Sequence, residues 1–344
     1  MVSRGGKFTR WGLAPVLVLV SALLFSGCDR TVPTFLNPSS TASKTEADLF
    51  WIILVIATII FVAVTSVLVY SIFRFRERPG MPAPRQFHGN TPLEIGWTIA
   101  PSIVLLIVLI FTITYINALA EPASTPQTIN VKAVAHQWWW EFQYEGSDPA
   151  VVTADELHIP VGTVVHVDLF SDNVIHSLWV PELQGKTDVI PGHDNHLWLR
   201  ADRTGNFRGE CTEYCGDQHA NMNFVVIAES PDAYSSWFQN QQLEAMAPTT
   251  DQQTRGQQDF LHQGCVACHN IAGVAPVGSK VGPNLTHFGG RQLIAGWVLS
   301  NTPDNLATWL HDPQAVKKGS DMVLAQPLTD DQVSDLVAYL ESLK

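Results

Sequence analysis

Residues 211–222 read Cys211-Thr-Glu-Tyr-Cys215-Gly-Asp-Gln-His219-Ala-Asn-Met222, a short segment with four metal-binding side chains. Two thiolates four residues apart can point into one pocket, and a tight loop can return His219 and Met222 to it. A second imidazole has to come from elsewhere, and His176 is the candidate. Thiolate, imidazole and thioether together suit copper held for electron transfer and argue against zinc or a hard cation. A Cys211–Cys215 disulfide is the alternative, but it leaves the spacing of His219 and Met222 unexplained.

The chain on either side of this loop alternates between apolar and polar residues. Residues 128–133 and 164–169 show this period of two most clearly, and turn residues such as Pro191-Gly192 and Thr204-Gly205 separate such runs. Successive side chains of a strand point to opposite faces, so the pattern predicts half-buried strands. Many short strands without a long helix predict an antiparallel sandwich or barrel.

A second cysteine motif, Cys265-Val-Ala-Cys268-His269, lies beyond this region. Two thiols three residues apart can form thioethers to both vinyl groups of a haem, which leaves the His269 imidazole beneath the iron. Residues 256–263 have a helical pattern, and Thr329-Asp-Asp-Gln332 is a capping box ahead of an apolar helical face. We therefore predict a small all-α haem domain.

Two uncharged apolar runs, residues 49–73 and 95–120, precede the predicted strands. Each is long enough to cross a ~30 Å hydrocarbon core as a helix. The loop between them, residues 74–94, contains Arg74, Arg76, Arg78 and Arg85, so the positive-inside rule places it in the cytoplasm. A buried helix of a soluble domain is the alternative for each run. We predict a transmembrane hairpin with everything after it on the extracytoplasmic side.

The first residues have the pattern of a signal peptide, with basic residues before an apolar core. The core ends in Ser26-Gly27-Cys28, which resembles the lipobox of bacterial lipoproteins. We expect cleavage after residue 27 and lipidation of Cys28; an uncleaved anchor helix is the alternative. All five cysteines are then assigned to lipid, copper or haem, and none is left for an ordinary disulfide.

Composition agrees with a membrane protein that has substantial soluble parts. The chain has 344 residues, of which 46% are hydrophobic and 15% are charged. Its formal net charge of -12 argues against nucleic-acid binding, which needs a basic surface. The acidity is compatible with a docking surface for a basic partner, and equally with plain solubility.

The stretch from the hairpin through Ser230 resembles subunit II of the haem-copper cytochrome c oxidases. The resemblance implies a dinuclear CuA centre whose ligands are His176, Cys211, Cys215, His219, Met222 and the backbone carbonyl of Glu213. It also implies that the Glu213 carboxylate helps to ligate Mg²⁺ at the interface with the catalytic subunit.

Two other stretches carry the same resemblance. In His136-Gln-Trp138-Trp-Trp-Glu141, Trp138 matches the family's electron-entry residue, although such an aromatic cluster is more often part of a core. In Leu93-Glu94-Ile-Gly-Trp, Glu94 matches a glutamate at the entrance of a proton path, although it could be a simple interfacial residue. The chain departs from the family at Asn173, where Asp is common, and at His193, where Pro-Gly-Arg is common. These departures concern contacts around the copper ligands and contacts with other subunits, and they leave the copper ligands themselves unchanged.

The C-terminal region resembles class I c-type cytochromes. This resemblance makes Met322 the sixth haem ligand, and Met/His ligation raises the haem potential. Met246 is a weaker rival, and Met322 could also be a packing residue. The loop Gly282-Pro-Asn-Leu285 matches the one that orients the proximal histidine, here His269.

The whole chain is similar to the cytochrome-c-fused, caa-type form of oxidase subunit II. This implies an electron-entry subunit in a bacterial cytoplasmic membrane, which accepts electrons from an external donor through haem c and CuA. The donor could be a cytochrome c, a blue copper protein or a quinol-oxidising complex. Oxygen reduction and proton pumping would reside in subunit I, with subunit III a further partner.

Other proteins share parts of this chemistry. A CuA-bearing subunit of a nitric oxide reductase is the main alternative. A copper-free scaffold subunit of a quinol oxidase disagrees with the intact ligand set, and a soluble nitrous oxide reductase lacks the hairpin.

The expected organisation follows from these patterns. We predict a signal peptide (1–27), an N-terminal extracytoplasmic segment (28–48), the hairpin (49–120), a cupredoxin-like CuA domain (121–230), a linker (231–250) and a cytochrome c domain (251–344).

Overall fold

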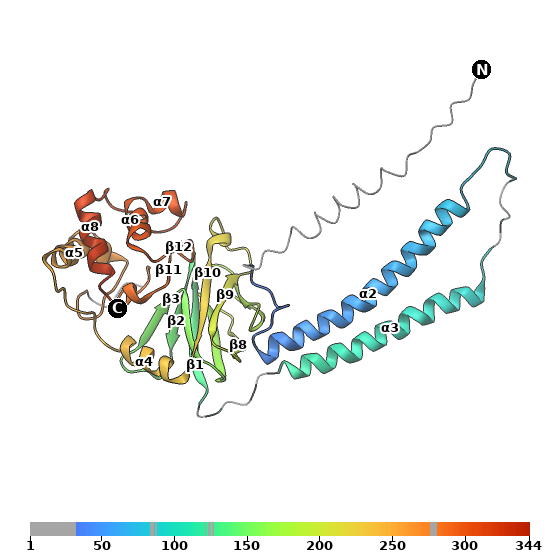
Figure 1. Ribbon diagram of the computed structural model, residues 1–344, viewed down its shortest axis with the longest axis horizontal. Helices are drawn as coiled ribbons and strands as arrows, with labels where there is room; N and C mark the ends of the chain where they lie inside the picture. Colours follow the sequence, from blue (N-terminus) through green and yellow to red (C-terminus); the bar gives the residue numbers. More distant parts are fainter. Residues whose placement is uncertain are drawn as a thin grey trace, which may run out of the picture.

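The computed structural model describes residues 32–82, 86, 88–120, 122, 125, 127–275 and 281–344. A helix hairpin, a β-sandwich and a helical C-terminal domain follow one another along the long axis of the molecule (Figure 1). The predicted multidomain fold class is therefore confirmed. Arg85 and Cys28 lie outside the described residues, so the lipidation of Cys28 stays a prediction.

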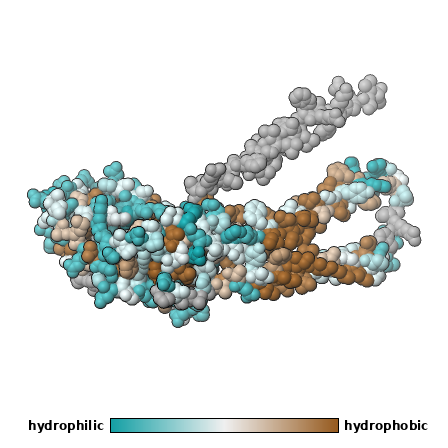
Figure 2. Space-filling model, turned by 60° about the horizontal axis from the view of Figure 1, so that its bottom comes forward, coloured by the Kyte–Doolittle hydropathy of each residue, from teal (hydrophilic) through white to brown (hydrophobic). Residues whose placement is uncertain are grey.

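The hairpin consists of α2 (Thr41–Arg74) and α3 (Thr91–Ala118). Both helices begin before their apolar runs, because Ser40 and Asn90 cap their N-termini with side-chain oxygens. No residue of α3 is buried, and the buried residues of α2 lie in its first two turns. On the face shown in Figure 2, the exposed surfaces of both helices form a hydrophobic band. Long helices that are apolar and exposed over this length span a membrane.

The outer end of the hairpin is tied to the sandwich by hydrogen bonds. The Ser43 hydroxyl donates to the Pro181 carbonyl at 2.8 Å, and the Ser39 amide donates to the Glu182 carbonyl at the same distance. At the end of α3, the Trp198 indole donates to the Leu119 carbonyl at 3.2 Å. These contacts place the base of the hairpin against the turn before β7 and against β8.

Two five-stranded sheets form the sandwich, in the orders β3-β2-β1-β5-β8 and β4-β10-β9-β6-β7. The strands are β1 (Ile129–His136), β2 (Trp139–Tyr144), β3 (Val151–Ala154), β4 (Glu156–Pro160), β5 (Val165–Ser171), β6 (His176–Val180), β7 (Gln184–Val189), β8 (Asn195–Leu199), β9 (Gly205–Cys211) and β10 (Asn223–Glu229).

The predicted antiparallel pairing needs one correction. β1 pairs with β5, and β4 with β10, in parallel. These partners are distant in the chain, and period-two alternation reports which face is buried but not the direction of a partner strand.

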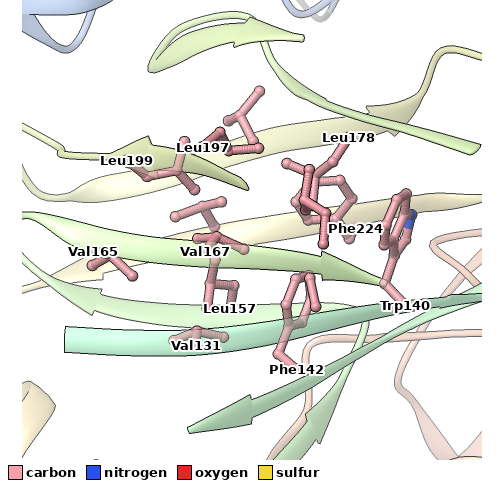
Figure 3. Close-up of a cluster of buried hydrophobic side chains, with 14 of the residues drawn as sticks. Val131, Trp140, Phe142, Leu157, Val165, Val167, Leu178, Leu197, Leu199 and Phe224 are labelled. Carbon is pink, nitrogen blue, oxygen red and sulfur yellow. The ribbon is translucent and has the colours of Figure 1, made fainter. Parts of the chain in front are cut away.

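The inward-facing residues of the two sheets form one apolar core (Figure 3). Val131, Ala133, Val165, Val167 and Leu169 are fully buried, as the alternation predicts. One end of the sandwich carries residues 211–222, which we call the copper loop. Towards this end, aromatic rings of both sheets meet. Trp140 and Phe142 each lie 5.5 Å from Phe224, measured between ring centroids. This rigid packing supports the loop that follows β9.

The C-terminal region begins with α4 (Pro231–Gln241), which packs on the sandwich by stacking Trp237 against His158 at 4.0 Å between ring centroids. The helical domain then comprises α5 (Asp251–His262), α6 (Pro303–His311), α7 (Pro313–Val316) and α8 (Asp330–Leu340), with a small hairpin of β11 (Leu293–Ile294) and β12 (Leu299–Ser300).

α5 crosses α8 at Gly256, where an added Cβ would lie 2.0 Å from the Asp335 carbonyl oxygen. The predicted capping box at Thr329 and Gln332 is present. The domain lies at the end of the sandwich away from the membrane hairpin (Figure 1).

Candidate metal centre

Strand pairing brings the predicted copper ligands together. Leu178 of β6 pairs with Cys211 of β9, which puts His176 at the start of β6 beside the end of β9. The chain then leaves β9 through a loop containing Cys215 and the short 3₁₀ turn His219–Asn221, and returns as β10. The Cys211 amide donates to the Met222 carbonyl at 3.1 Å, which closes the loop at its base.

The donor atoms converge on one buried pocket. The Cys211 and Cys215 sulfurs are 3.8 Å apart, and the ligand atoms of His176 and both cysteines lie within 4.8 Å of one another. His176 Nδ1 is 3.8 Å from the Cys211 sulfur, and His219 Nδ1 is 3.7 Å from the Cys215 sulfur. Met222 Sδ is 3.8 Å from the Cys215 sulfur. All four cysteines that the structure describes are free, so the disulfide alternative is wrong.

Backbone and neighbouring groups orient this donor set. The Glu213 carbonyl lies 3.3 Å from the Cys211 sulfur, while the Glu213 side chain is exposed. His176 Nε2 lies 3.1 Å from the Asn173 side-chain oxygen, which leaves Nδ1 directed at the sulfurs. Asn173 thus supplies the outer hydrogen bond at the position where the family commonly has Asp.

The two thiols are electrostatically coupled. The contact between the two sulfurs, with further help from His176, lowers the pKa of Cys211 below its ordinary value. The same interaction, together with burial, raises the pKa of Cys215. A bound metal cation would favour the thiolate form of both sulfurs.

Trp138 lies beside this pocket. Its half-buried indole donates to the Cys215 carbonyl at 2.9 Å, and the Gln137 side chain donates to the same carbonyl at 2.7 Å. The indole is therefore one hydrogen bond away from the backbone of a predicted ligand.

The second cysteine motif has a geometry that suits haem. Cys265 is the first residue of the 3₁₀ turn Cys265–Ala267, and Cys268 follows this turn directly. Burial raises the pKa of Cys265. His269 Nδ1 lies 2.8 Å from the Pro283 carbonyl, which fixes the ring and leaves Nε2 for iron. Gly282 packs on that ring, and an added Cβ would lie 2.6 Å from His269 Cε1. The loop 282–285 thus orients His269 as the sequence predicted.

Met322 and Met246 lie in different surroundings. Met322 is half-buried and packs against the same apolar core as Cys265. Met246, the rival ligand, is exposed. The assignment of Met322 as the sixth ligand stays a prediction.

Glu94 lies at the opposite end of the molecule, in the first turn of α3. Its carboxylate accepts a hydrogen bond from the Asn90 amide at 3.2 Å, so it caps its own helix. The structure leaves its predicted role in a proton path untested.

Sequence reasoning missed Lys317, a residue of the helical domain that is 4% exposed and reaches the copper loop. A lysine pair followed by glycine is typical of a solvated loop, so no sequence signal identifies it.

Comparisons with known protein families agree with this architecture. A profile described as the transmembrane domain of cytochrome c oxidase subunit II matches residues 31–114. The profile of the periplasmic domain of the same subunit matches residues 147–229, and a cytochrome c profile matches residues 253–344.

Relatives match over most of the chain. Cytochrome c oxidase subunit 2 of Alkalihalophilus pseudofirmus is 40% identical over 299 residues, which is 84% of this chain and 86% of the relative. The protein of the same name from Bacillus subtilis is 31% identical and covers 97% of this chain and 98% of its own length. Quinol oxidase subunit 2 of Bacillus anthracis is 30% identical over 70% of this chain and 84% of its own.

Among solved structures, the periplasmic domain of subunit II of cytochrome oxidase from Bradyrhizobium japonicum is 28% identical, with a TM-score of 0.32, and covers 34% of this chain and 94% of its own. The profiles, the relatives and the convergence of histidine, cysteine and methionine donors lead to one conclusion. The chain belongs to the cytochrome c oxidase subunit II family and combines a CuA-type site with a fused cytochrome c domain.

Proposed function

We propose that this subunit is the electron-entry point of its oxidase and that it holds a copper pair and a haem c in fixed positions. The observation that carries the proposal is the buried pocket in which two cysteine sulfurs 3.8 Å apart are each approached by an imidazole nitrogen. A mononuclear blue copper site needs one thiolate, whereas two thiolates can bridge a pair of soft ions.

The donor chemistry fits copper. The residues that would hold the copper are His176, His219 and Met222, the backbone carbonyl of Glu213, and the thiolates of Cys211 and Cys215. Mixed thiolate, imidazole and thioether donors favour copper over zinc. Because Cys211, Cys215 and Met222 are buried within the sandwich core, their positions change little with oxidation state.

The residues around the second motif fit a covalently held haem. Cys265 and Cys268 would form the thioethers, and His269 and Met322 would be the axial ligands. The Pro283 carbonyl holds the His269 ring, and the missing Cβ of Gly282 leaves room for it. When bound, copper and haem supply one-electron carriers through which electrons from an external donor can reach the oxygen-reducing subunit I.

Other residues would serve the assembled complex. The exposed Glu213 carboxylate is available to ligate Mg²⁺ at a subunit interface. Glu94, in the first turn of α3, would mark the entrance of a proton path in subunit I. The arginines after α2 support a cytoplasmic loop, with both soluble domains outside a bacterial cytoplasmic membrane. Subunit III and a lipid on Cys28 complete the proposed assembly.

Metal analysis of the purified subunit tests the proposal. We expect two coppers and one haem iron per chain, and an EPR spectrum of one unpaired electron shared by two copper nuclei. A single copper, or the spectrum of an electron localised on one copper, would contradict the copper assignment. Haem that is released by denaturation would contradict covalent attachment through Cys265 and Cys268.

A further inference from the structure

The buried side chain of Lys317 connects the helical C-terminal domain to the β-sandwich that contains the copper loop. Lys317 Nζ donates to the carbonyls of Trp138 at 2.7 Å, Asn221 at 3.0 Å and Ala295 at 3.2 Å. An ammonium group has three N–H donors, and all three are used here. The first two carbonyls belong to the sandwich and the third to the helical domain, so one side chain bridges both.

The sandwich end of this bridge is the copper loop itself. Asn221 directly precedes Met222, and Trp138 is hydrogen-bonded to the Cys215 carbonyl. A second contact lies beside the first, because the Gln218 side chain donates to the Lys318 carbonyl. Lys317 and its neighbour therefore hold the segment between two predicted copper ligands.

The other end of the bridge leads to Met322. The Gln314 side-chain amide donates to the Ser320 carbonyl at 2.7 Å and to the Met322 carbonyl at 3.1 Å. Its oxygen accepts from the Gly319 amide at 2.9 Å. Three hydrogen bonds with Gln314 thus hold the backbone of residues 319–322. Through this segment, the position of Met322 is linked to that of Lys317.

The contact between the two domains at Lys317, here called the junction, is closely packed around Gly296. A Cβ added to Gly296 would lie 2.6 Å from Lys317 Nζ and 2.7 Å from the Asn221 carbonyl oxygen. Gly296 has φ +69°, and its neighbours Ala295 and Trp297 have φ +57° and +68°. Such a backbone is costly for residues with side chains and persists where surrounding contacts determine it.

A second group of contacts between the sandwich and the helical domain lies at the small β11–β12 hairpin. The Glu156 carboxylate of the sandwich accepts from the Gln292 amide at 2.6 Å and from the Leu293 amide at 3.3 Å. The Arg208 guanidinium lies over the Trp297 ring at 5.6 Å from its centroid. The helical domain is therefore docked by several specific polar contacts.

We propose that Lys317 is a positioning residue that fixes the geometry between the haem and copper sites for electron transfer. The inference rests on the proposed function, since it takes Met322 and Met222 as ligands of the two centres. A docked domain keeps one short separation, whereas a domain held by a linker alone would meet the copper loop only part of the time. Burial lowers the pKa of Lys317 to about 8, so the ammonium remains protonated at pH 7.

The test compares Lys317→Met with Lys318→Met in the full-length subunit within its oxidase complex. Lys318 is adjacent and exposed, so its variant removes the same charge from the same segment. Flash reduction of the haem gives the rate of the haem-to-copper step, and EPR relaxation of the copper signal reports the proximity of the haem iron. Redox titration gives the potential of each centre.

We expect Lys317→Met to slow the haem-to-copper step about tenfold and to weaken the relaxation enhancement, because the two sites lose their fixed orientation. Both potentials and the metal content should stay at their original values, and Lys318→Met should match the unsubstituted protein. A normal rate in Lys317→Met would overturn the inference. A slower haem-to-copper step together with a shifted redox potential of either centre would also overturn it. Lys317 would then act on the structure of that centre and not on the distance between the two centres.

A steric variant gives an independent answer if Lys317→Met does not accumulate. Gly296→Ala places a methyl group in the junction and should slow the same step, whereas Gly290→Ala meets nothing within 4 Å and should not. Equal rates in these two variants would contradict the inference. Absence of copper or haem from the unsubstituted protein would contradict the proposed function, and with it this inference.

Discussion

The copper site and the haem site are supported in different ways. Cys211, Cys215 and Met222 belong to a sandwich core of twenty-six buried side chains. Among its described residues, the helical domain has a core of thirteen buried side chains, and Cys265 and Met322 lie at the margin of this core. A small ion needs ligands that the protein has already placed, whereas a large covalent cofactor can itself fill part of a core. The sandwich should therefore fold without copper, and the helical domain should depend on haem.

Removal of each cofactor gives the largest expected difference. Cys265→Ser with Cys268→Ser should remove most of the ~5 kcal/mol that stabilises a small domain, because its core loses the haem. Hydrogen exchange of the intact subunit would then show loss of protection in α5 and α8. The matched pair is Cys211→Ser with Cys215→Ser, which should lose both coppers while the sandwich strands stay protected and haem c stays attached. Full protection of α5 and α8 without haem would contradict the comparison.

The axial methionine sharpens the comparison within the haem domain. Met322→Leu should leave the haem attached, because both cysteines and His269 are unchanged. Its midpoint potential should fall by on the order of 0.1 V, within the ~0.8 V range that axial ligands control. Redox titration measures the change, and Met246→Leu is the control because Met246 is exposed. An unchanged potential in Met322→Leu would show that another group binds the iron.

Close packing on the proximal histidine gives a smaller effect. Gly282→Ala should force the His269 ring to move and cost about 1–3 kcal/mol of haem-domain stability. Thermal unfolding followed by haem absorbance measures it. Gly290→Ala adds the same methyl group where nothing lies within 4 Å. If both variants unfold at the same temperature, the contact between Gly282 and the ring is not tight.

The smallest structural effect is expected beside the copper loop. Trp138→Phe removes the indole donor to the Cys215 carbonyl and should cost about 0.5–1.5 kcal/mol, since the rigid sandwich keeps its ligands in place. The haem should remain fully reducible, and only its electron transfer to copper should slow. Stopped-flow spectroscopy follows the two centres separately. Slower haem reduction in this variant would place Trp138 on a different step.

The sequence predicted what depends on local spacing. The loop from Cys211 to Met222 and the motif from Cys265 to His269 bring their donors together over a few residues, so ligand chemistry alone identified them. The helix starts were less predictable. Capping by Ser40 extends α2 beyond its apolar run, and capping by Thr250 starts α5 at Asp251.

The junction between the domains could not be predicted. Lys317 binds carbonyls of Trp138 and Asn221, which are 179 and 96 residues away in the chain. Backbone carbonyls are present at every residue, so they leave no pattern in the sequence. The strained turn at Ala295 and Trp297 is equally invisible, because neither residue type favours a positive φ.

Time-resolved reduction of the intact oxidase by its donor tests the central claim most directly, namely that electrons enter this subunit at the haem domain and leave it from the copper domain. We predict that the haem is reduced first, at a rate that rises with donor concentration. Copper should follow in a step whose rate does not depend on donor concentration, because that step occurs within one chain. Copper reduced first, at a rate proportional to donor concentration, would contradict the account.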